Sequence, residues 1–373
     1  MPQHRIISAD SHATIGQEYL LDALPKKYHE AVKAAAPGGM GLGPVPADAK
    51  APAMDMSGMV RAIEIQRGGD RPSGRAGGSD PVERIKDMDI DGVEAEVLHC
   101  AVGGAHLATE DDADMQAAFV HAENEARQAW CATDPQRLIP VAKLPLHNLD
   151  AAVKELEWLG REGFRAVEIP VYPDEVGLKP YGHESWAPLW NVASDLEIPL
   201  HLHVGTNNGL QRVMHYDRTP SRTIYQSLPP IYMAECISSW ILPGTFDRHP
   251  GMKVLLAEAG VTWIPYYVDR LDTMMVRHRL EQLEMLKEQP SFYWRRNMAC
   301  SFEEDANAKG HILEAVGVDN VLWATDYPHP DSTWPHSQEV VTNLFGDLSD
   351  EHRAKISGGN AERLYKLAVP ATV

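Results

Sequence analysis

Short runs of apolar residues recur along the chain, separated by segments in which apolar residues return every three or four positions. Eight of the runs are predicted to be strands, at residues 5–10, 95–100, 138–144, 166–170, 199–203, 253–258, 298–302 and 321–326. Most are apolar almost throughout, as strands are when both faces of a parallel sheet are covered. Eight strands alternating with helices predict a (β/α)8 TIM barrel. A doubly wound open sheet is the alternative, weakened in its dinucleotide-binding form because no GxGxxG motif follows the first run.

The segments between the runs carry the periodicity of amphipathic helices. In residues 148–163 the apolar stripe is Leu149, Ala152, Val153, Leu156 and Leu159. Such a stripe covers one face of a sheet, and Gly163 suits the end of the helix. Residues 115–131 show the same spacing.

Two stretches interrupt this alternation. Residues 34–81 are crowded with Gly, Pro and Ala, and predict a long insertion after the first strand that is either passive or a lid over the site. Residues 205–235 predict a second polar loop, directly after the fifth strand. With both included, we expect residues 1–373 to form a single barrel domain, because one large α/β barrel fits this length.

Composition narrows the class of partner. Hydrophobic residues make up 44% and charged residues 23% of the chain, which are values typical of globular proteins. A formal net charge of -19 argues against nucleic acid as a partner, because phosphate-backbone binding needs a basic face. We expect no signal peptide, because the first residues lack a positive segment followed by an apolar stretch. The sequence has no apolar run long enough for a membrane span, and its four cysteines are widely spaced. We therefore expect a cytoplasmic protein that acts on a small molecule.

Side chains able to bind metal stand at or near the ends of four predicted strands. These are Asp10 and His12, then His201 and His203, then Glu258, and finally Asp326 with His329 close behind it. In a TIM barrel the active site lies at the carboxyl ends of the strands. Side chains two positions apart on a strand point to the same face, so the two members of each early pair aim together. Imidazoles and carboxylates in this arrangement bind Zn²⁺, Mn²⁺ or Fe²⁺; the competing interpretation is a set of local caps and turns.

Four segments carry a resemblance to a known family: SADSH at 8–12, IPLHLHVGTN at 198–207, the stretch at 246–272, and WATDYPHPDSTWP at 323–335. They resemble the amidohydrolase superfamily, and within it the amidohydrolase-2 branch, which contains aminocarboxymuconate-semialdehyde decarboxylase and resorcylate-type decarboxylases. The resemblance implies a distorted barrel with one divalent metal, zinc first and manganese as the alternative. It also implies a homodimer. Carried over by position, the implied metal ligands are Asp10, His12, His203 and Asp326, with His203 preferred to His201 because it stands immediately before a short turn.

The sequence departs from that resemblance at one position. Where the decarboxylases carry a histidine after the sixth strand, this chain has Glu258. An ionised carboxylate cannot replace a cationic imidazole unless its pKa is raised. We therefore expect a metal-dependent hydrolase that attacks a carbonyl with metal-activated water. The alternatives are a non-oxidative decarboxylase of an aromatic or unsaturated acid, and a metal-binding barrel without catalysis.

Roles follow for the remaining side chains. Asp326 is expected to take the water proton, while His201, Glu258 or His329 stabilises the oxyanion or protonates the leaving group. Arginines suit a two-pronged grip on a substrate carboxylate, and an indole suits the wall of a pocket. The predicted substrate contacts are Arg212, Arg218, Arg222 and Trp334.

Overall fold

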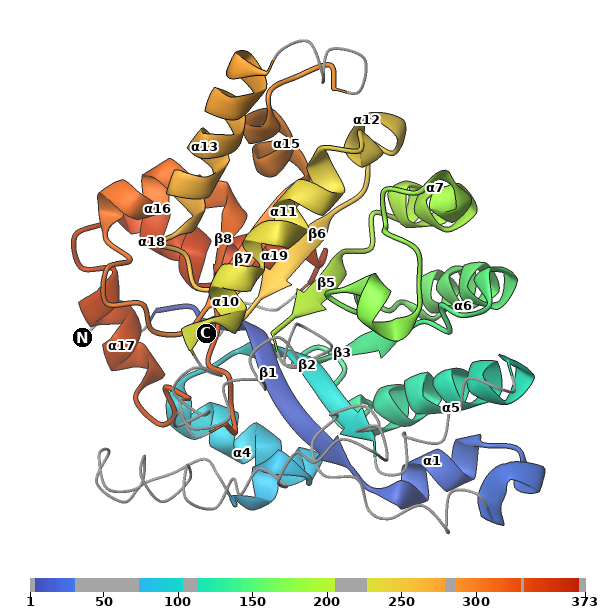
Figure 1. The fold of residues 1–373 in the computed structure, drawn as a ribbon. Coiled ribbons are helices and arrows are strands. Elements are labelled where there is room, and N and C mark those ends of the chain that lie inside the picture. The colour runs from blue at the N-terminus through green and yellow to red at the C-terminus, as the bar shows by residue number, and fades with distance from the viewer. Residues whose placement is uncertain are drawn as a thin grey trace, which may run out of the picture.

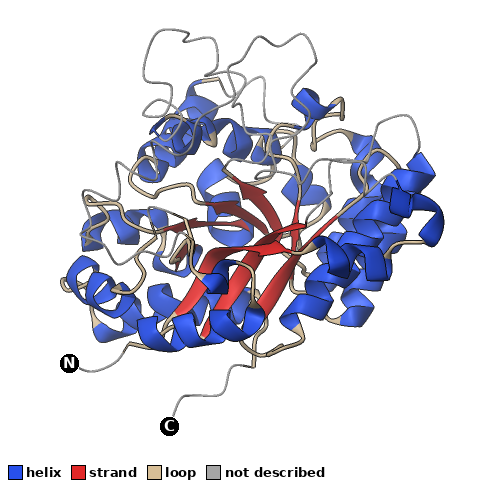
Figure 2. Ribbon diagram, turned by 90° about the horizontal axis from the view of Figure 1, so that it is seen from below, coloured by secondary structure: helices blue, strands red, loops and turns tan. Residues whose placement is uncertain are grey.

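Eight parallel strands form the centre of the molecule, and helices surround them (Figures 1 and 2). The computed structural model describes residues 4–30, 74–102, 113–204, 227–278, 286–329 and 332–368. Neighbouring strands pair in chain order, and each pairs in parallel with the next. The predicted (β/α)8 barrel is confirmed. That all 373 residues form one domain remains a prediction.

All eight strands lie where the apolar runs predict them. Their bounds are β1 (Ile7–Ile15), β2 (Ala95–Val102), β3 (Leu138–Lys143), β4 (Ala166–Glu168), β5 (Leu200–His203), β6 (Val254–Ala257), β7 (Met298–Phe302) and β8 (Val321–Trp323).

The described helices lie between and around the strands, and none of them is both long and apolar enough to cross a membrane. The α-helices are α1 (Gln17–Ala23), α4 (Pro81–Asp91), α5 (Ala113–Cys131), α6 (Leu149–Glu162), α7 (Ala187–Leu196), α10 (Pro229–Tyr232), α11 (Ala234–Ile241), α12 (Thr245–Arg248), α13 (Ile264–Arg277), α15 (Pro290–Asn297), α16 (Gly310–Val316), α17 (Ser337–Leu344), α18 (Asp350–Ala354) and α19 (Asn360–Leu364). Short 3₁₀ turns are η1 (Lys26–Tyr28), η2 (Ala76–Gly78), η4 (Pro173–Val176), η5 (Glu184–Trp186) and η6 (Val318–Asn320), and one π-helical turn is η7 (Lys355–Gly359).

Local sequence fixes the ends of the best-defined helices. The side chain of Asn148 caps α6 by accepting a hydrogen bond of 3.1 Å from the backbone N–H of Ala151. Gly163 ends the same helix with a φ of 85°, in the left-handed region that glycine enters without a steric cost. The expected helices at 148–163 and 115–131 are therefore confirmed as α6 and α5.

The two predicted loops differ in how far the structure describes them. Of the insertion at 34–81, residues 34–73 lie outside the described part of the chain, and its end forms η2 and the start of α4. Whether the insertion is a lid therefore remains a prediction. Of the polar loop predicted at 205–235, residues 205–226 lie outside the described part of the chain, and its last residues are helical in α10 and the start of α11. Proline at the start of a helix explains this, since the first turn needs no backbone donor there.

The first strand runs further than predicted and contains an irregularity. It continues past Asp10 to Ile15, because residues 11–15 pair with 98–102 of β2. The register shifts between Ser8 and Ser11, where β1 has one residue more than the opposing stretch of β2. Such bulges turn side chains toward new directions next to functional sites. Asp10 lies inside this bulge.

The apolar core is divided in two by the barrel wall. Most buried apolar residues lie in one cluster that includes the helices. A second, separate cluster takes alternate residues from the strands: Ile7, Ala9, Ala95, Val97, Ile139, Val141, Ala166, Leu255, Ala257, Ala299 and Leu322, with Ala361 and Tyr365 from the C-terminal helix region. Because alternate strand residues share a face, this second cluster fills the barrel interior.

Backbone hydrogen bonds between the first strand and the segment after β8 close the barrel. The N–H of Asp326 donates to the carbonyl of Asp10 at 3.1 Å, and the N–H of His12 donates to the carbonyl of Tyr327 at 2.6 Å. Ser8 adds a side-chain link, because its hydroxyl accepts from the N–H of Thr325 at 2.9 Å. The closure therefore brings together residues from the two ends of the chain.

A buried arginine stabilises the junction between β1 and the segment after β8. Arg84 of α4 is fully buried and donates to the carboxylate of Glu96 at 2.6 Å. It also donates to the carbonyl oxygens of His12, at 2.8 Å, and Tyr327, at 3.3 Å. Its guanidinium lies 4.1 Å from the centre of the Tyr327 ring. One cation thus satisfies a buried carboxylate and both sides of the junction.

We predict that Arg84→Met lowers the free energy of unfolding by about 3–5 kcal/mol, because Glu96 is then left buried without its partner. Urea denaturation of the purified chain measures this loss. Lys86→Met is the matched control, since Lys86 lies on the same helix but forms only an exposed pair with Glu83. A loss in Arg84→Met no larger than in the control would contradict a supporting role for Arg84.

Candidate metal centre

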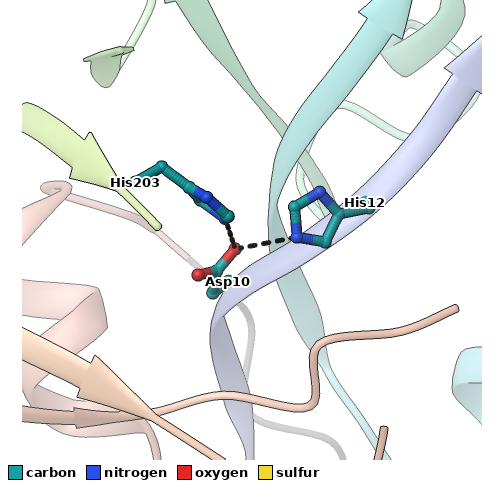
Figure 3. A group of neighbouring side chains, drawn as sticks. All are labelled: Asp10, His12 and His203. Carbon is teal, nitrogen blue, oxygen red and sulfur yellow. Dashed lines mark hydrogen bonds and ion pairs between the residues drawn. The ribbon is translucent and has the colours of Figure 1, made fainter. Parts of the chain in front are cut away.

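Three side chains converge at the mouth of the barrel, two from β1 and one from the end of β5 (Figure 3). The Oδ1 atom of Asp10 lies 3.3 Å from Nε2 of His203 and 3.6 Å from Nε2 of His12. Asp326, just after β8, brings its Oδ1 to within 3.0 Å of the same His12 nitrogen. The structure therefore brings together all four side chains that the sequence predicts as metal ligands.

Two of the polar atoms in this cluster suit a cation. Oδ2 of Asp10 and Nε2 of His12 are buried, and neither forms a hydrogen bond of good geometry with the described residues. Leaving buried polar atoms without partners costs free energy unless a bound group satisfies them. Imidazole nitrogens and carboxylate oxygens at this spacing are the ligands that Zn²⁺ and Mn²⁺ take in proteins. The donor set therefore fits one divalent cation.

The electrostatics of the cluster also favour a positive charge at its centre. Burial alone would raise the pKa of Asp10, but His203 and His99 lower it to about 2, so the group is ionised. Burial alone would lower the pKa of His203, but the Asp10 carboxylate raises it to about 10. His203 therefore holds a proton between carboxylates. A metal cation would have to displace that proton, which makes its affinity dependent on pH.

The segment after β8 adds a further imidazole to this cluster. Nδ1 of His329 lies 2.9 Å from Oδ1 of Asp326, and the His329 ring stacks on His12 with centres 4.0 Å apart. Burial opposes ionisation of Asp326, but His329 and His12 hold its pKa well below the ordinary value. Asp326 has a φ of 52°, a left-handed conformation that costs a non-glycine residue energy and is concentrated at functional sites. His329 therefore lies where the sequence predicts it, beside Asp326.

Glu258 follows the end of β6 in the same unusual conformation. Its φ is 55°, and its backbone N–H donates to the hydroxyl of Ser301 at 3.1 Å. Burial first, and then the charges of Asp326 and Glu303, raise the pKa of Glu258 well above its ordinary value. This differs from the expectation of an ionised carboxylate, because the sequence does not show how much negative charge surrounds the group.

His201 lies on the same strand face as His203 but one step deeper. Its Nδ1 lies 3.1 Å from Nε2 of His99, and its Nε2 lies 3.1 Å from the hydroxyl of Tyr365. These contacts place it behind the proposed ligands. From the sequence, His201 is expected to act on the oxyanion or the leaving group, whereas contacts at both of its ring nitrogens favour a supporting position.

Two buried polar residues escaped the sequence interpretation, His99 of β2 and Glu168 of β4. Nδ1 of His99 lies 2.8 Å from the Glu168 carboxylate, and the two residues are 5% and 8% exposed. The sequence did contain a sign that His99 faces the barrel interior, because it continues the inward alternation of Ala95 and Val97 toward the end of β2. A histidine at that position is the same kind of signal as the histidines near the ends of the other strands.

Of the four predicted substrate contacts, the structure describes only Trp334. Arg212, Arg218 and Arg222 lie outside the described residues, so their roles remain predictions. Trp334 is 7% exposed, and its indole N–H donates to the backbone carbonyl of Asp87 in α4 at 3.0 Å. This contact makes Trp334 part of the packing between α4 and the segment after β8.

Comparisons with known proteins agree with this architecture. A gamma-resorcylate decarboxylase from Rhizobium sp. (strain MTP-10005) is 25% identical over 300 residues, covering 76% of this chain and 86% of the relative. An amidohydrolase from Mycobacterium avium subsp. paratuberculosis K-10 superposes with a TM-score of 0.74 at 20% identity, covering 99% of each chain.

A third comparison concerns the metal. The crystal structure of a dihydroxybenzoic acid decarboxylase from Polaromonas sp. JS666, with bound manganese and the inhibitor 2-nitroresorcinol, superposes with a TM-score of 0.64 at 20% identity. The alignment covers 98% of this chain and 97% of the decarboxylase. At this identity the likeness establishes the fold. The match that decides the family is with the amidohydrolase-2 family itself, whose profile spans residues 31–367. The chain therefore belongs to the amidohydrolase-2 family of the amidohydrolase superfamily.

Proposed function

We propose that this protein is a metal-dependent, non-oxidative decarboxylase of an aromatic carboxylic acid. One observation carries the proposal: Asp10, His12, His203 and Asp326 meet at the mouth of the barrel, where burial and the charge of Asp326 also raise the pKa of Glu258 well above its ordinary value. A cation-binding site beside a proton donor supplies what a decarboxylation needs, namely a grip on the acid and a proton for the carbon left behind.

The comparisons support this proposal over the hydrolase that the sequence analysis placed first. Four gamma-resorcylate decarboxylases, two from Rhizobium and one each from Polaromonas and Rhodococcus, match this chain at 25% identity over 76% of its length. Solved decarboxylases of 5-carboxyvanillate and dihydroxybenzoate share the fold. Both findings favour the decarboxylase alternative of the sequence analysis.

Glu258 stands where the related decarboxylases carry a histidine, and this difference was the reason to expect a hydrolase from the sequence. An ionised glutamate would oppose the negative charge that develops as CO₂ leaves. A protonated one does the opposite, because it donates a proton to that carbon. In the proposed reaction the bond between the ring carbon and the carboxylate breaks, and its electron pair stays on the carbon. CO₂ departs and the proton of Glu258 joins the carbon, after which solvent restores the proton to Glu258.

The other residues hold and orient. Asp10, His12, His203 and Asp326 are the proposed ligands of one divalent cation, manganese or zinc. Such a cation supplies positive charge that neutralises and orients the substrate's carboxylate or phenolate. His329 fixes the Asp326 carboxylate through its Nδ1 atom. Arg212, Arg218 and Arg222 remain proposed contacts for the substrate carboxylate, and a homodimer in the cytoplasm remains the proposed state of the protein.

We predict that the purified chain holds about one divalent cation and that His12→Ala and Asp326→Ala each lose it, because a small coordination set loses affinity steeply with each ligand removed. Elemental analysis after gel filtration measures the content. His352→Ala, in the distant helix α18, is the control and is expected to keep the metal. Full occupancy in both ligand variants would refute the assignment.

A second prediction concerns Glu258. Glu258→Gln is expected to reduce the rate of CO₂ release from hydroxybenzoates by about 10²-fold, the effect of losing one acid–base group, while the metal content stays near that of the wild type. Glu258→His is expected to retain more activity than Glu258→Gln, because an imidazolium also donates a proton.

The measurement is CO₂ release from a panel containing 2,6-dihydroxybenzoate and 5-carboxyvanillate, with ester and amide hydrolysis assayed in parallel. Hydrolysis by the wild type without any CO₂ release would return the hydrolase to first place. Metal binding with neither reaction on a broad panel would favour the non-catalytic barrel.

A further inference from the structure

The barrel interior is apolar in its deeper layer and polar in the layer nearer the carboxyl ends of the strands. The lower layer is apolar and takes Ala95 and Val97 from β2 and Ala166 from β4. One step further along the same alternation, β2 places His99 and β4 places Glu168 inside the barrel, both nearly fully buried. TIM-barrel interiors are filled mostly by branched apolar side chains, so a polar layer beneath the ligands calls for a reason.

Four side chains of this layer form one continuous chain of hydrogen bonds. It runs from Glu168 to His99 at 2.8 Å, from His99 to His201 at 3.1 Å, and from His201 to the hydroxyl of Tyr365 at 3.1 Å. The chain crosses the interior from β4 through β2 and β5 to the residue that follows α19. All four residues are at most 8% exposed.

The chemistry of the two ends sets the direction of every bond. Although burial favours its neutral form, Lys143 and His99 hold the pKa of Glu168 well below the ordinary value, so Glu168 is a carboxylate that only accepts. Burial raises the pKa of Tyr365 well above its ordinary value, so Tyr365 keeps a proton to donate. When each of the two imidazoles carries a single ring proton, only one arrangement satisfies all three bonds. Both His99 and His201 then carry their proton on Nδ1.

This row of hydrogen-bonded side chains contacts the proposed ligands through His99. The Nε2 atom of His99 lies 3.8 Å from Oδ1 of Asp10, and its ring centre lies 4.4 Å from that of His203. His99 also pairs in register with His12 across β1 and β2, and Glu168 pairs with His201 across β4 and β5. Within the hydrogen-bonded row, His99 is therefore the residue that packs directly against Asp10 and His203.

We propose that His99 is a positioning residue, fixed as its Nδ1–H tautomer by Glu168, that holds the Asp10 and His203 side chains in the orientation that binds the metal. The inference rests on the proposed metal centre. Outer partners of metal ligands set ligand orientation, and their loss typically costs about 10–100-fold in metal affinity or activity. A purely structural interior layer would instead contribute to folding stability and leave metal affinity unchanged.

The first test reads the tautomers directly. In the full-length chain labelled with ¹⁵N-histidine, NMR is expected to show His99 and His201 protonated on Nδ1 and unprotonated on Nε2. In Glu168→Gln the acceptor-only carboxylate is gone, and His99 is expected to populate both tautomers. A wild-type His99 protonated on Nε2, or already exchanging between tautomers, would overturn the proposal.

The second test measures the consequence for the metal without using activity. His99→Gln keeps the net charge of a neutral histidine and an acceptor near the Nε2 position, but leaves Glu168 without its donor. Titration with Mn²⁺ alone, followed by calorimetry, is expected to show a dissociation constant raised by about 10-fold or more. Circular dichroism and thermal melting check that the variant is folded.

His249→Gln is the matched control, because His249 is also a buried histidine but lies before β6, outside the hydrogen-bonded chain. It is expected to bind Mn²⁺ as the wild type does. A folded His99→Gln with wild-type affinity would overturn the positioning role while leaving the metal centre intact. A wild type that binds neither Mn²⁺ nor Zn²⁺ would instead overturn the metal centre, and with it this inference. If His99→Gln does not fold, the tautomers of the wild type and of Glu168→Gln decide.

Discussion

The closure of the barrel between β1 and the segment after β8 is the constraint on which the site depends. Two backbone hydrogen bonds, from Asp326 to Asp10 and from His12 to Tyr327, join residues more than three hundred positions apart in the printed sequence. Each bond involves a residue whose side chain is a proposed metal ligand or lies next to one. The same two bonds that complete the barrel therefore set the spacing of Asp10, His12 and Asp326. The ligands need no flexible loop to bring them together.

This arrangement concentrates charge at a place that the rest of the fold keeps rigid. Burial raises the energy of every ionised group, so the carboxylates of Asp10 and Asp326 stay ionised only because imidazoles lie beside them. Beneath them, Glu168 and His99 form a second buried pair of the same kind. The large apolar cluster between strands and helices lies outside this polar interior. The barrel can therefore hold charged side chains at its mouth while the outer core supplies the stability.

Glu258 shows how surroundings, more than residue type, decide the chemistry of a site. As an isolated glutamate it would be ionised and would suit the activation of water. Burial and the charges of Asp326 and Glu303 raise its pKa well above the ordinary value, and a carboxyl group that keeps its proton suits donation to carbon. The same side chain thus supports two different reactions, and only its neighbours distinguish between them. This is why the likeness to decarboxylases and the presence of glutamate in place of histidine are compatible.

Local pattern was enough to predict the eight strands and the helices α5 and α6, because alternation and capping residues lie within a few residues of each other. The four proposed ligands came from the family resemblance, and the structure brings their side chains together. It was not enough to extend β1 to Ile15 or to place the bulge at Asp10, since pairing with β2 decides both. Nor could it find the bond from His99 to Glu168, or the rise in the pKa of Glu258. Those depend on which side chains from distant strands meet inside the barrel, and on how little water reaches them there. The sequence by itself determined the scaffold and the residue types near the ends of its strands; the tertiary structure decided which of those side chains meet, because strands far apart in the sequence come together only in the closed barrel.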